Sequence, residues 1–301
     1  ALDSGSAKGM AHIGVIETLE KEGYQITAVA GTSMGAIVAA YYCLGKLDVL
    51  KSWLTGLNKK STFMTIDFSF SGGFIGGKKL MQAFEEHLGE ATFADTKIPL
   101  YITATNLDTG KERIFSEGSI IHAIRASISV PGVMRPYLYE GNYYVDGAVT
   151  NPLPVDVLHN NKHKNIVAVH LHEYIEERDS SSAPGVLETM SRSMGIVSRY
   201  LAKAKMQEAV AVIEPNVAGI DMFHFYQAQV VIERGAQAAK SAVEQGALDS
   251  IALKILNNFK EKISNRIIYI MKKKLGKNSN NSPHFIFILQ TLQALQCLFL
   301  H

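Results

Sequence analysis

The sequence has little cysteine, little proline and no long hydrophobic run, and each shortage excludes a class of protein. Its two cysteines, Cys43 and Cys297, are too few and too far apart for a disulfide framework or a metal motif. We expect Cys43 to be a free, buried thiol on a helix. Eight prolines among 301 residues exclude collagen-like and proline-rich architectures. No apolar run reaches the length of about 18 residues that a transmembrane helix needs.

A large excess of charge is also missing, because the net charge of +2 gives no reason to expect binding to nucleic acid. The charge is nevertheless uneven. Residues 251–301 hold eight Lys or Arg and one acidic residue, which gives +7 and leaves −5 for the first 250 residues. We expect a catalytic domain at 1–245 and a basic C-terminal extension at 246–301. The extension either lies on an anionic membrane or is a solvated appendage.

The apolar stretch 285–300 within this extension could dock on the domain, pair with another protomer or belong to a further domain. The sequence does not indicate an oligomeric state. It begins at Ala1 rather than Met and shows no signal peptide. We expect a cytoplasmic or membrane-peripheral location and leave open whether a segment precedes Ala1.

Short apolar runs alternate with helical patterns over the first 175 residues, which is typical of α/β proteins. Strands are expected at 26–31, 100–107, 112–115, 143–145, 165–172 and 209–213. Helices are expected at 33–44, 79–88, 119–127, 186–207 and 228–247, with Ser119 as an N-cap. The segment 178–184 is expected to be a polar loop.

The main chemical signal is the stretch 31–35, which reads Gly-Thr-Ser-Met-Gly and matches G-x-S-x-G. A buried strand precedes it and a helix of small residues follows, as in a nucleophile elbow. Side chains at Gly31 and Gly35 would collide with neighbouring backbone, and Ser33 would sit on a strained turn. A glycine-rich turn without chemistry is the alternative interpretation.

A serine nucleophile needs an oxyanion hole, and residues 3–9 offer one. This stretch reads Asp-Ser-Gly-Ser-Ala-Lys-Gly, a loop with backbone N–H groups free to point at an anion. A phosphate-binding loop is the rival interpretation, but neither the Walker pattern nor the dinucleotide fingerprint is present.

The serine also needs a base, and the sequence offers two kinds. His170 and His172 follow Asp146 in the order of an α/β-hydrolase triad, although both lie in an apolar strand where core histidines are more common. The other candidate is Asp146 itself, which ends a strand and precedes Gly147 and Ala148.

Four blocks in order resemble the patatin-like phospholipase family, closest to its bacterial neuropathy-target-esterase-like branch. The blocks are the glycine-rich loop 4–15, the elbow 31–35, the Ala-Ser-Ile-Ser-Val-Pro stretch 126–131, and Asp-Gly-Ala at 146–148 followed by Asn-Pro-Leu-Pro at 151–154. The resemblance covers about residues 1–245. It implies a three-layer α/β fold with a central, mostly parallel sheet flanked by helices, and it implies hydrolysis of phospholipid or lysophospholipid without cofactor or metal.

The resemblance also implies roles for individual residues. Ser33 would be the nucleophile of a Ser–Asp dyad, and Asp146 would take its proton and later activate water. The oxyanion hole would be formed by backbone N–H groups of Gly5, Ser6 and Ala7. Lys8 would help to fix the loop, and the motif is supported by Gly9, Gly31, Gly35, Gly147 and Ala148.

The loop departs from the family pattern at two positions. Ser6 stands where the family usually has glycine, and Asp3 is also unusual. If this position requires positive φ, serine costs on the order of 1 kcal/mol there. The departure favours one rival hypothesis, a catalytically silent lipid-binding module. The other rival is an α/β-hydrolase-type esterase with a Ser–Asp–His triad.

The substrate side offers a phenylalanine-rich segment at 62–75, with glycine pairs at 72–73 and 76–77 as hinges. It is either a mobile apolar flap or a strand and loop packed into the core. Lys78 and Lys79 follow it and would either meet a headgroup phosphate or be solvated.

Overall fold

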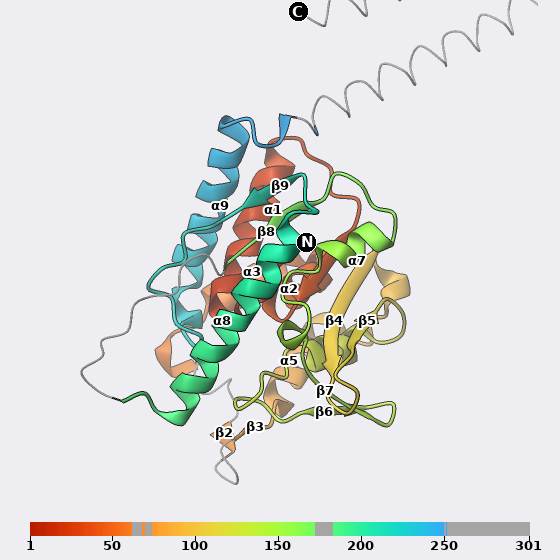
Figure 1. Cartoon of the computed structure of the whole chain (residues 1–301), viewed down its shortest axis with the longest axis vertical. Helices are drawn as coiled ribbons and strands as arrows, with labels where there is room; N and C mark the ends of the chain where they lie inside the picture. Colours follow the sequence, from red (N-terminus) through yellow and green to blue (C-terminus); the bar gives the residue numbers. More distant parts are fainter. Residues whose placement is uncertain (62–67, 70–73, 172–182, 250, 252–301) are drawn as a thin grey trace, which may run out of the picture. The chain divides into compact units, whose positions relative to one another are not determined.

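The computed structural model describes residues 1–61, 68–69, 74–171, 183–249 and 251 (Figure 1). The chain divides into two compact units, Ala1–Ala247 and Leu248–His301, and nearly all of the second lies outside the described residues. The expected domain boundary after residue 245 therefore stays a prediction. Every helix and strand with described bounds belongs to the first unit.

The first unit alternates helices and strands along the chain. Its strands are β1 (Val29–Thr32), β2 (Phe68–Ser69), β3 (Phe74–Ile75), β4 (Leu100–Asn106), β5 (Glu112–Phe115), β6 (Tyr137–Tyr139), β7 (Asn142–Asp146), β8 (Val167–Val169) and β9 (Ala211–Ile213). Its α-helices are α1 (Ala11–Lys21), α2 (Met34–Cys43), α3 (Leu47–Thr55), α5 (Lys78–Leu88), α6 (Ile120–Ser127), α7 (Val155–Asn160), α8 (Val186–Met206) and α9 (Ala228–Glu244). Short 3-10 helices are η1 (Ser6–Met10), η2 (Phe93–Asp95), η3 (Gly147–Val149) and η4 (Phe225–Gln227).

β1 lies in the middle of the sheet, and all four of its residues are buried. One edge of β1 pairs in parallel with β4. At the other edge Leu2 forms parallel bridges to Gly31 and to Val169, so residues at the start of the chain join β1 to the parallel pair β8–β9. β5 and β7 both pair antiparallel with β4, and β6 pairs antiparallel with β7.

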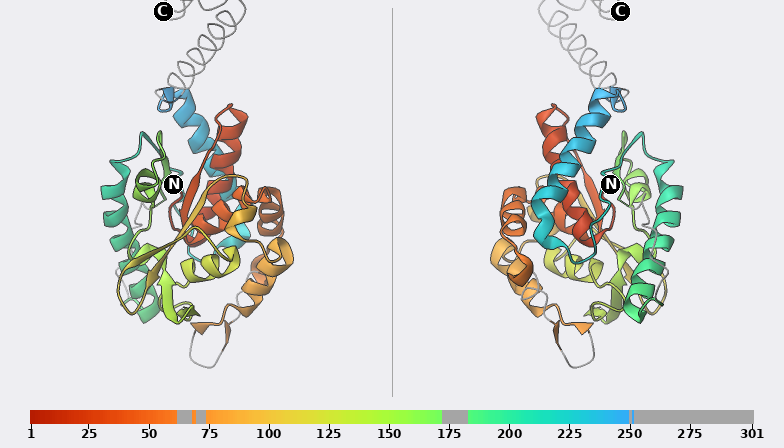
Figure 2. Two further views of the ribbon diagram at one scale, coloured as in Figure 1. Left: turned by 90° about the vertical axis from the view of Figure 1, so that its right-hand side faces the viewer. Right: turned by 90° about the vertical axis from the view of Figure 1, so that its left-hand side faces the viewer.

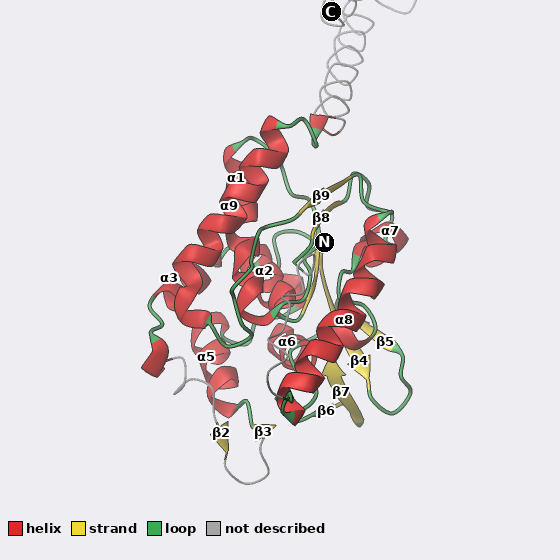
Figure 3. Cartoon of the chain, turned by 60° about the vertical axis from the view of Figure 1, so that its left-hand side comes forward, coloured by secondary structure: helices red, strands yellow, loops and turns green. Residues whose placement is uncertain are grey.

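Helices cover both faces of this sheet, as Figure 3 shows. On one face α2 packs on β1 and α6 on β4, with α1 and α9 outside them. On the other face α7 contacts β1 and α8 contacts α7, around a buried cluster that includes Ala30, Leu153 and Ala202. The predicted three-layer α/β fold with a mostly parallel central sheet is thus confirmed. Strands β5, β6 and β7 form its antiparallel part.

The outer helices α1 and α9 lie side by side in both views of Figure 2. Their backbones cross closely at two glycines. A Cβ atom at Gly14 would overlap the carbonyl of Ile232, and one at Gly235 would overlap the carbonyl of Ala11. Because glycine lacks a Cβ, these two positions let α9 pack tightly over the start of α1.

Most elements lie close to where the sequence predicts them. β5 has the expected bounds, and the Ser119 side chain caps α6 by accepting a hydrogen bond from the His122 N–H. Several strands are shorter than expected. β1 starts only at Val29, where its pairing with β4 begins, β8 is confined to Val167–Val169, and β9 to Ala211–Ile213. Cys43 is free and buried on α2, as expected. His172, most of the loop 178–184 and most of the segment 62–75 lie outside the described residues.

Candidate active site

Ser33 lies on the turn between β1 and α2 with backbone angles of φ 56° and ψ −121°. This region is sparsely populated for residues with a side chain, so tight packing must hold Ser33 there. The glycines on either side permit that packing. A Cβ at Gly31 would overlap the backbone of Gly35, and a Cβ at Gly35 would lie 2.5 Å from the carbonyl oxygen of Leu2. The strained, glycine-flanked turn expected from the sequence is present.

β4 brings Ser33 and Asp146 together. β1 runs parallel to β4 and ends with Thr32 opposite Thr103, whereas β7 runs antiparallel and ends with Asp146 opposite Ala104. Because β5 occupies the other edge of β4, the two strands approach each other end to end along one edge. The Ser33 hydroxyl donates a hydrogen bond of 2.7 Å to the Asp146 carboxylate oxygen Oδ2.

The Asp146 carboxylate is almost completely buried, at 1% exposure. Its other oxygen, Oδ1, accepts a 2.8 Å hydrogen bond from the Ala148 N–H. Burial raises the pKa of Asp146 to about 6, although the hydrogen bonds from Ser33 and Ala148 favour the ionised form. A carboxylate with this pKa can accept a proton near neutral pH and release it again.

Ser33 and Asp146 are also held in place by α6 and the loop after it, which the sequence did not predict. The Ser127 side-chain oxygen accepts a 2.8 Å hydrogen bond from the Ser33 N–H. The Ser129 carbonyl accepts a 2.9 Å hydrogen bond from the Asp146 N–H. The available signal was the Ala-Ser-Ile-Ser-Val-Pro stretch, which contains both serines, but this pattern does not indicate which residues they contact.

The glycine-rich loop passes beside Ser33. Ser6 has φ 46°, so it stands in the left-handed region that favours glycine, and this backbone strain costs on the order of 1 kcal/mol. Within the described part of the chain, the N–H groups of Gly5 and Ser6 have no acceptor, whereas the Ala7 N–H donates to the Met222 carbonyl at 3.3 Å. Two of the three expected oxyanion donors are thus available to an anion.

The supporting residues are packed tightly around the dyad. A Cβ at Gly9 would lie 2.5 Å from the Met34 side chain, and a Cβ at Gly147 would lie 2.5 Å from the Thr103 carbonyl oxygen. Ala148 contributes its N–H to Asp146. These contacts explain the small residues in the motif, since a larger side chain would displace η1 or η3.

His170, the rival base, has a different partner. It is buried, and its Nδ1 lies 2.8 Å from the Asp3 carboxylate oxygen Oδ2. The same Asp3 oxygen accepts a 3.0 Å hydrogen bond from the Leu171 N–H. Asp3, the unusual residue of the loop, therefore links the loop to the chain just after β8, and Ser33 hydrogen-bonds directly to Asp146.

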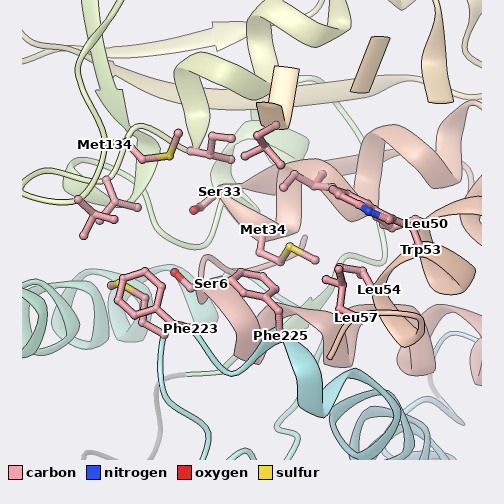
Figure 4. A pocket seen from close by; sticks show the side chains of 16 residues that line it. Ser6, Ser33, Met34, Leu50, Trp53, Leu54, Leu57, Met134, Phe223 and Phe225 are labelled. Carbon is pink, nitrogen blue, oxygen red and sulfur yellow. The ribbon is translucent and has the colours of Figure 1, made fainter. Parts of the chain in front are cut away.

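Two pockets meet at Ser33. The first has an empty volume of about 910 Å³ and a lining that is apolar apart from Ser6 and Ser33; we call it the apolar chamber (Figure 4). Its other lining residues are Met34, Ile37, Leu50, Trp53, Leu54, Leu57, Leu80, Ile128, Val130, Val133, Met134, Met222, Phe223 and Phe225. In Figure 4 the hydroxyl groups of Ser6 and Ser33 both point into this space.

The second pocket, which we call the polar chamber, has an empty volume of about 1050 Å³. It shares Ser6, Ser33, Val130 and Met222 with the apolar chamber. Its remaining lining is Ser4, Gly5, Lys8, Asp146, Ala148, Ser191, Arg192, Met194, Gly195, Ser198, Ile220 and Asp221. Ser33 therefore lies at the junction between an apolar space and a polar one.

Two further properties concern only the described residues. They contain no group of three or more His, Cys, Asp or Glu side chains placed to hold a metal ion. No helix among them is both long enough and apolar enough to span a bilayer.

The comparisons with known proteins identify the family. Residues 1–159, more than half of the chain, match the family model described as patatin-like phospholipase. The chain belongs to the patatin-like phospholipase family. The matched region contains the glycine-rich loop, the elbow and Asp146.

Individual relatives point to one branch of this family. An uncharacterized NTE family protein of Mycobacterium tuberculosis is 38% identical over 156 residues, which are 52% of this chain and 43% of the relative. The neuropathy target esterase of Drosophila melanogaster is 27% identical over 175 residues, 56% of this chain and 12% of that protein. The matched part of the chain thus corresponds to less than half the length of these relatives.

Among solved structures, VipD from Legionella pneumophila is 15% identical, with a TM-score of 0.41 over 79% of this chain and 66% of that one.

Proposed function

We propose that this protein is a serine lipid acyl hydrolase of the phospholipase A or lysophospholipase type. Family membership itself implies a lipid hydrolase. The 2.7 Å hydrogen bond from the Ser33 hydroxyl to the buried Asp146 carboxylate carries the finer proposal. It supports the proposal, because a hydroxyl that donates to a carboxylate can give up its proton to that carboxylate, and because Ser33 lines an apolar chamber suited to an acyl chain.

In the proposed reaction, the Ser33 oxygen attacks the ester carbonyl carbon while its proton passes to Asp146. The N–H groups of Gly5 and Ser6 and the positive end of α2 stabilise the oxyanion. The carbon–oxygen bond to the alcohol then breaks, and the alcohol leaves with the proton from Asp146. Water next attacks the acyl-enzyme and gives a proton to Asp146. The bond between the acyl carbon and the Ser33 oxygen then breaks, Asp146 returns the proton to the Ser33 oxygen, and the fatty acid is released.

The rival triad requires His170 or His172 to act on Ser33, and His172 lies outside the described residues. The contact between His170 and Asp3 disfavours this role for His170, because the imidazole is buried against a different carboxylate. The silent lipid-binding module is the other alternative, and the strained Ser6 is the observation that favours it.

A fluorophosphonate probe and three variants test these alternatives. The wild type should be labelled at Ser33 and should hydrolyse fatty-acyl esters, whereas Ser33→Ala and Asp146→Asn should lose activity by at least about a thousandfold. His170→Asn should keep its activity per folded molecule, when the folded fraction is counted by active-site titration with the probe.

Two results would reject the proposal. The triad would be established if Asp146→Asn kept its activity and His170→Asn lost it, with each activity divided by the number of sites that the probe labels. A wild-type protein that the probe does not label would establish the silent lipid-binding module.

Contact with an anionic membrane is a further part of the proposal, because residues 251–301 of the C-terminal extension carry +7. The extension lies outside the described residues except for its first few positions.

A further inference from the structure

Ser6 is the residue of the glycine-rich loop that stands where the family usually has glycine, and it is held at a cost. Its φ of 46° lies in the left-handed region that favours glycine. A residue with a side chain persists in such a conformation only where the surrounding structure holds it there, and residues of this kind cluster at functional sites. We therefore expect the side chain of Ser6 to do something that glycine cannot.

The Ser6 side chain faces the same space as the candidate nucleophile. Ser6 and Ser33 are two of the four residues that line both chambers. Ser6 belongs to η1 and Ser33 to the turn between β1 and α2, and the hydroxyl groups of both point into the apolar chamber (Figure 4). The fold thus places a second hydroxyl group in the space that Ser33 faces.

No described residue forms a hydrogen bond with the Ser6 hydroxyl. The other described side chains that line the apolar chamber, apart from Ser33, carry no oxygen that could accept one. An acyl chain that displaces water from this chamber would therefore leave the hydroxyl without a partner, which costs free energy. The cost is avoided if the substrate brings an acceptor of its own, and the ester carbonyl oxygen is such an acceptor.

The place of this carbonyl oxygen follows from the proposed function, on which this inference rests. In that reaction the oxyanion accepts a hydrogen bond from the Ser6 N–H. The side-chain oxygen of a serine is no more than about 4 Å from its own backbone nitrogen. Because the Ser6 hydroxyl points into the chamber where the ester lies, an oxygen bound by the Ser6 N–H is also within reach of the hydroxyl.

We propose that the Ser6 hydroxyl is a third donor to the oxyanion and hence a catalytic residue. As the Ser33 oxygen bonds to the carbonyl carbon, an electron pair of the C=O bond moves onto the carbonyl oxygen. The Ser6 O–H donates a hydrogen bond to that oxygen and keeps its proton. This hydrogen bond is stronger in the transition state than in the bound ester, because its acceptor gains negative charge only there.

Two substitutions separate the hydroxyl from the backbone strain. Ser6→Gly removes the hydroxyl and relaxes the left-handed φ, whereas Ser6→Ala removes the hydroxyl and keeps the strain. Both should lower kcat on a soluble ester by about tenfold to a hundredfold, the usual effect of a hydrogen bond to a charged group. Both should change KM by less than about twofold, because the interaction is made in the transition state. Ser6→Gly should still unfold at no lower temperature than the wild type.

The matched control for the relief of strain is Lys162→Gly. Lys162 is exposed, has a φ of 65° and lines neither chamber. Glycine relaxes the same kind of left-handed backbone there. This variant should keep the kcat and KM of the wild type and should also unfold at no lower temperature.

A second measurement does not depend on turnover. An alkyl trifluoromethyl ketone forms a tetrahedral oxyanion with a serine nucleophile, whereas the alkyl alcohol of the same chain length enters the apolar chamber without reacting. The fluorescence of Trp53, the sole tryptophan and a lining residue of that chamber, reports both dissociation constants. Each Ser6 variant should raise the Kd of the ketone by the factor by which it lowers kcat, and should leave the Kd of the alcohol unchanged.

Three results would overturn the inference and leave the proposed hydrolase intact. The first is a Ser6→Gly protein with the kcat of the wild type or a higher one. The second is a loss of kcat in Ser6→Gly that Ser6→Ala does not share, because backbone freedom would then be its cause. The third is a loss of affinity for the alcohol as large as that for the ketone, which would show a structural role.

Failure of the proposed function itself has a different signature. It would be a wild-type protein that hydrolyses no ester and binds the ketone no more tightly than the alcohol. That result would reject the hydrolase, and the role of the Ser6 hydroxyl with it.

Discussion

At the scale of single residues, Asp146 is held at a cost in stability. Its carboxylate is buried, and its pKa rises from 3.8 to about 6. A buried acid with a raised pKa favours the protonated form in the folded state. Its contribution to stability is therefore most favourable below pH 3.8 and is lost as the pH rises through about 6.

This sign predicts that Asp146→Asn stabilises the fold while abolishing activity. Asparagine can still accept from the Ala148 N–H and can donate to the Ser33 oxygen, so the hydrogen bonds are preserved. The free energy of unfolding at pH 8 should rise by up to about 3 kcal/mol, and the gain should shrink at pH 5. Urea denaturation at the two pH values measures it.

The control for this prediction is Asp108→Asn, which changes an exposed carboxylate. Substitutions at exposed positions usually change stability by less than about 0.5 kcal/mol, so the free energy of unfolding of this variant should stay close to that of the wild type. A destabilised Asp146→Asn protein at pH 8 would show that the ionised carboxylate contributes more through its hydrogen bonds than burial costs.

The same pKa predicts the acid limb of the activity profile. Only the ionised carboxylate of Asp146 can accept the Ser33 proton, so kcat/KM should fall as the pH drops through about 6. The rate should change tenfold per pH unit well below that value. A soluble ester measured between pH 4.5 and 8, with stability checked at each pH, tests this; a limb centred near pH 4 would contradict the burial effect.

At the scale of secondary-structure elements, α6 and the loop after it hold Ser33 and Asp146 in place. Ser127 accepts from the Ser33 N–H, and truncation to alanine would leave a buried N–H without an acceptor. We expect Ser127→Ala to cost about 1 to 3 kcal/mol of stability. It should also lower kcat by about tenfold or more, because the nucleophile would no longer be fixed.

The matched control lies at the other end of the same helix. Ser119→Ala removes the N-cap of α6 and should cost about 1 kcal/mol of stability, but it should leave kcat within about twofold. Thermal unfolding and steady-state kinetics on both variants separate the two effects. Equal losses of kcat would show that Ser127 acts only through the stability of α6.

The secondary-structure elements and the short motifs of this protein could be predicted from the sequence. Ser33 and Asp146 each stand in a short local pattern, and each follows a strand that is visible as an apolar run. Their meeting along one edge of β4 was not predictable from periodicity, because pairing register depends on contacts between distant segments. The short length of β1 was unpredictable for the same reason, because its bounds depend on its pairing with β4 and not on its apolar pattern.

The two chambers also could not be predicted from the sequence. Arg192 is one of several basic residues on α8, and nothing in its neighbourhood distinguishes it from Arg199. Only the packing of α8 beside η1 and the loop before α9 brings it into the space next to Ser33. The apolar chamber likewise combines residues from α2, α3, α5 and η4, which are separated by long stretches of chain.

At the scale of the whole molecule, the excess of positive charge and the candidate active site occupy different parts of the chain. Every described residue that lines the two chambers lies before Ala247, in the part with a net negative charge. Catalysis on a soluble ester and attachment to a lipid surface should therefore be separable.

A chain that ends at Ala247 should hydrolyse a soluble short-chain ester with unchanged kcat/KM but should bind anionic vesicles less well than the full chain. Binding of the full chain should weaken with added salt, because surface charges are screened within about 10 Å at 0.1 M ionic strength. Co-sedimentation with vesicles containing phosphatidylserine measures it. A full-length variant with Lys272, Lys273 and Lys274 changed to Gln is the matched control, since it removes charge without removing chain. If the full chain, the truncated chain and this variant sediment equally, the basic extension does not attach the protein to membranes.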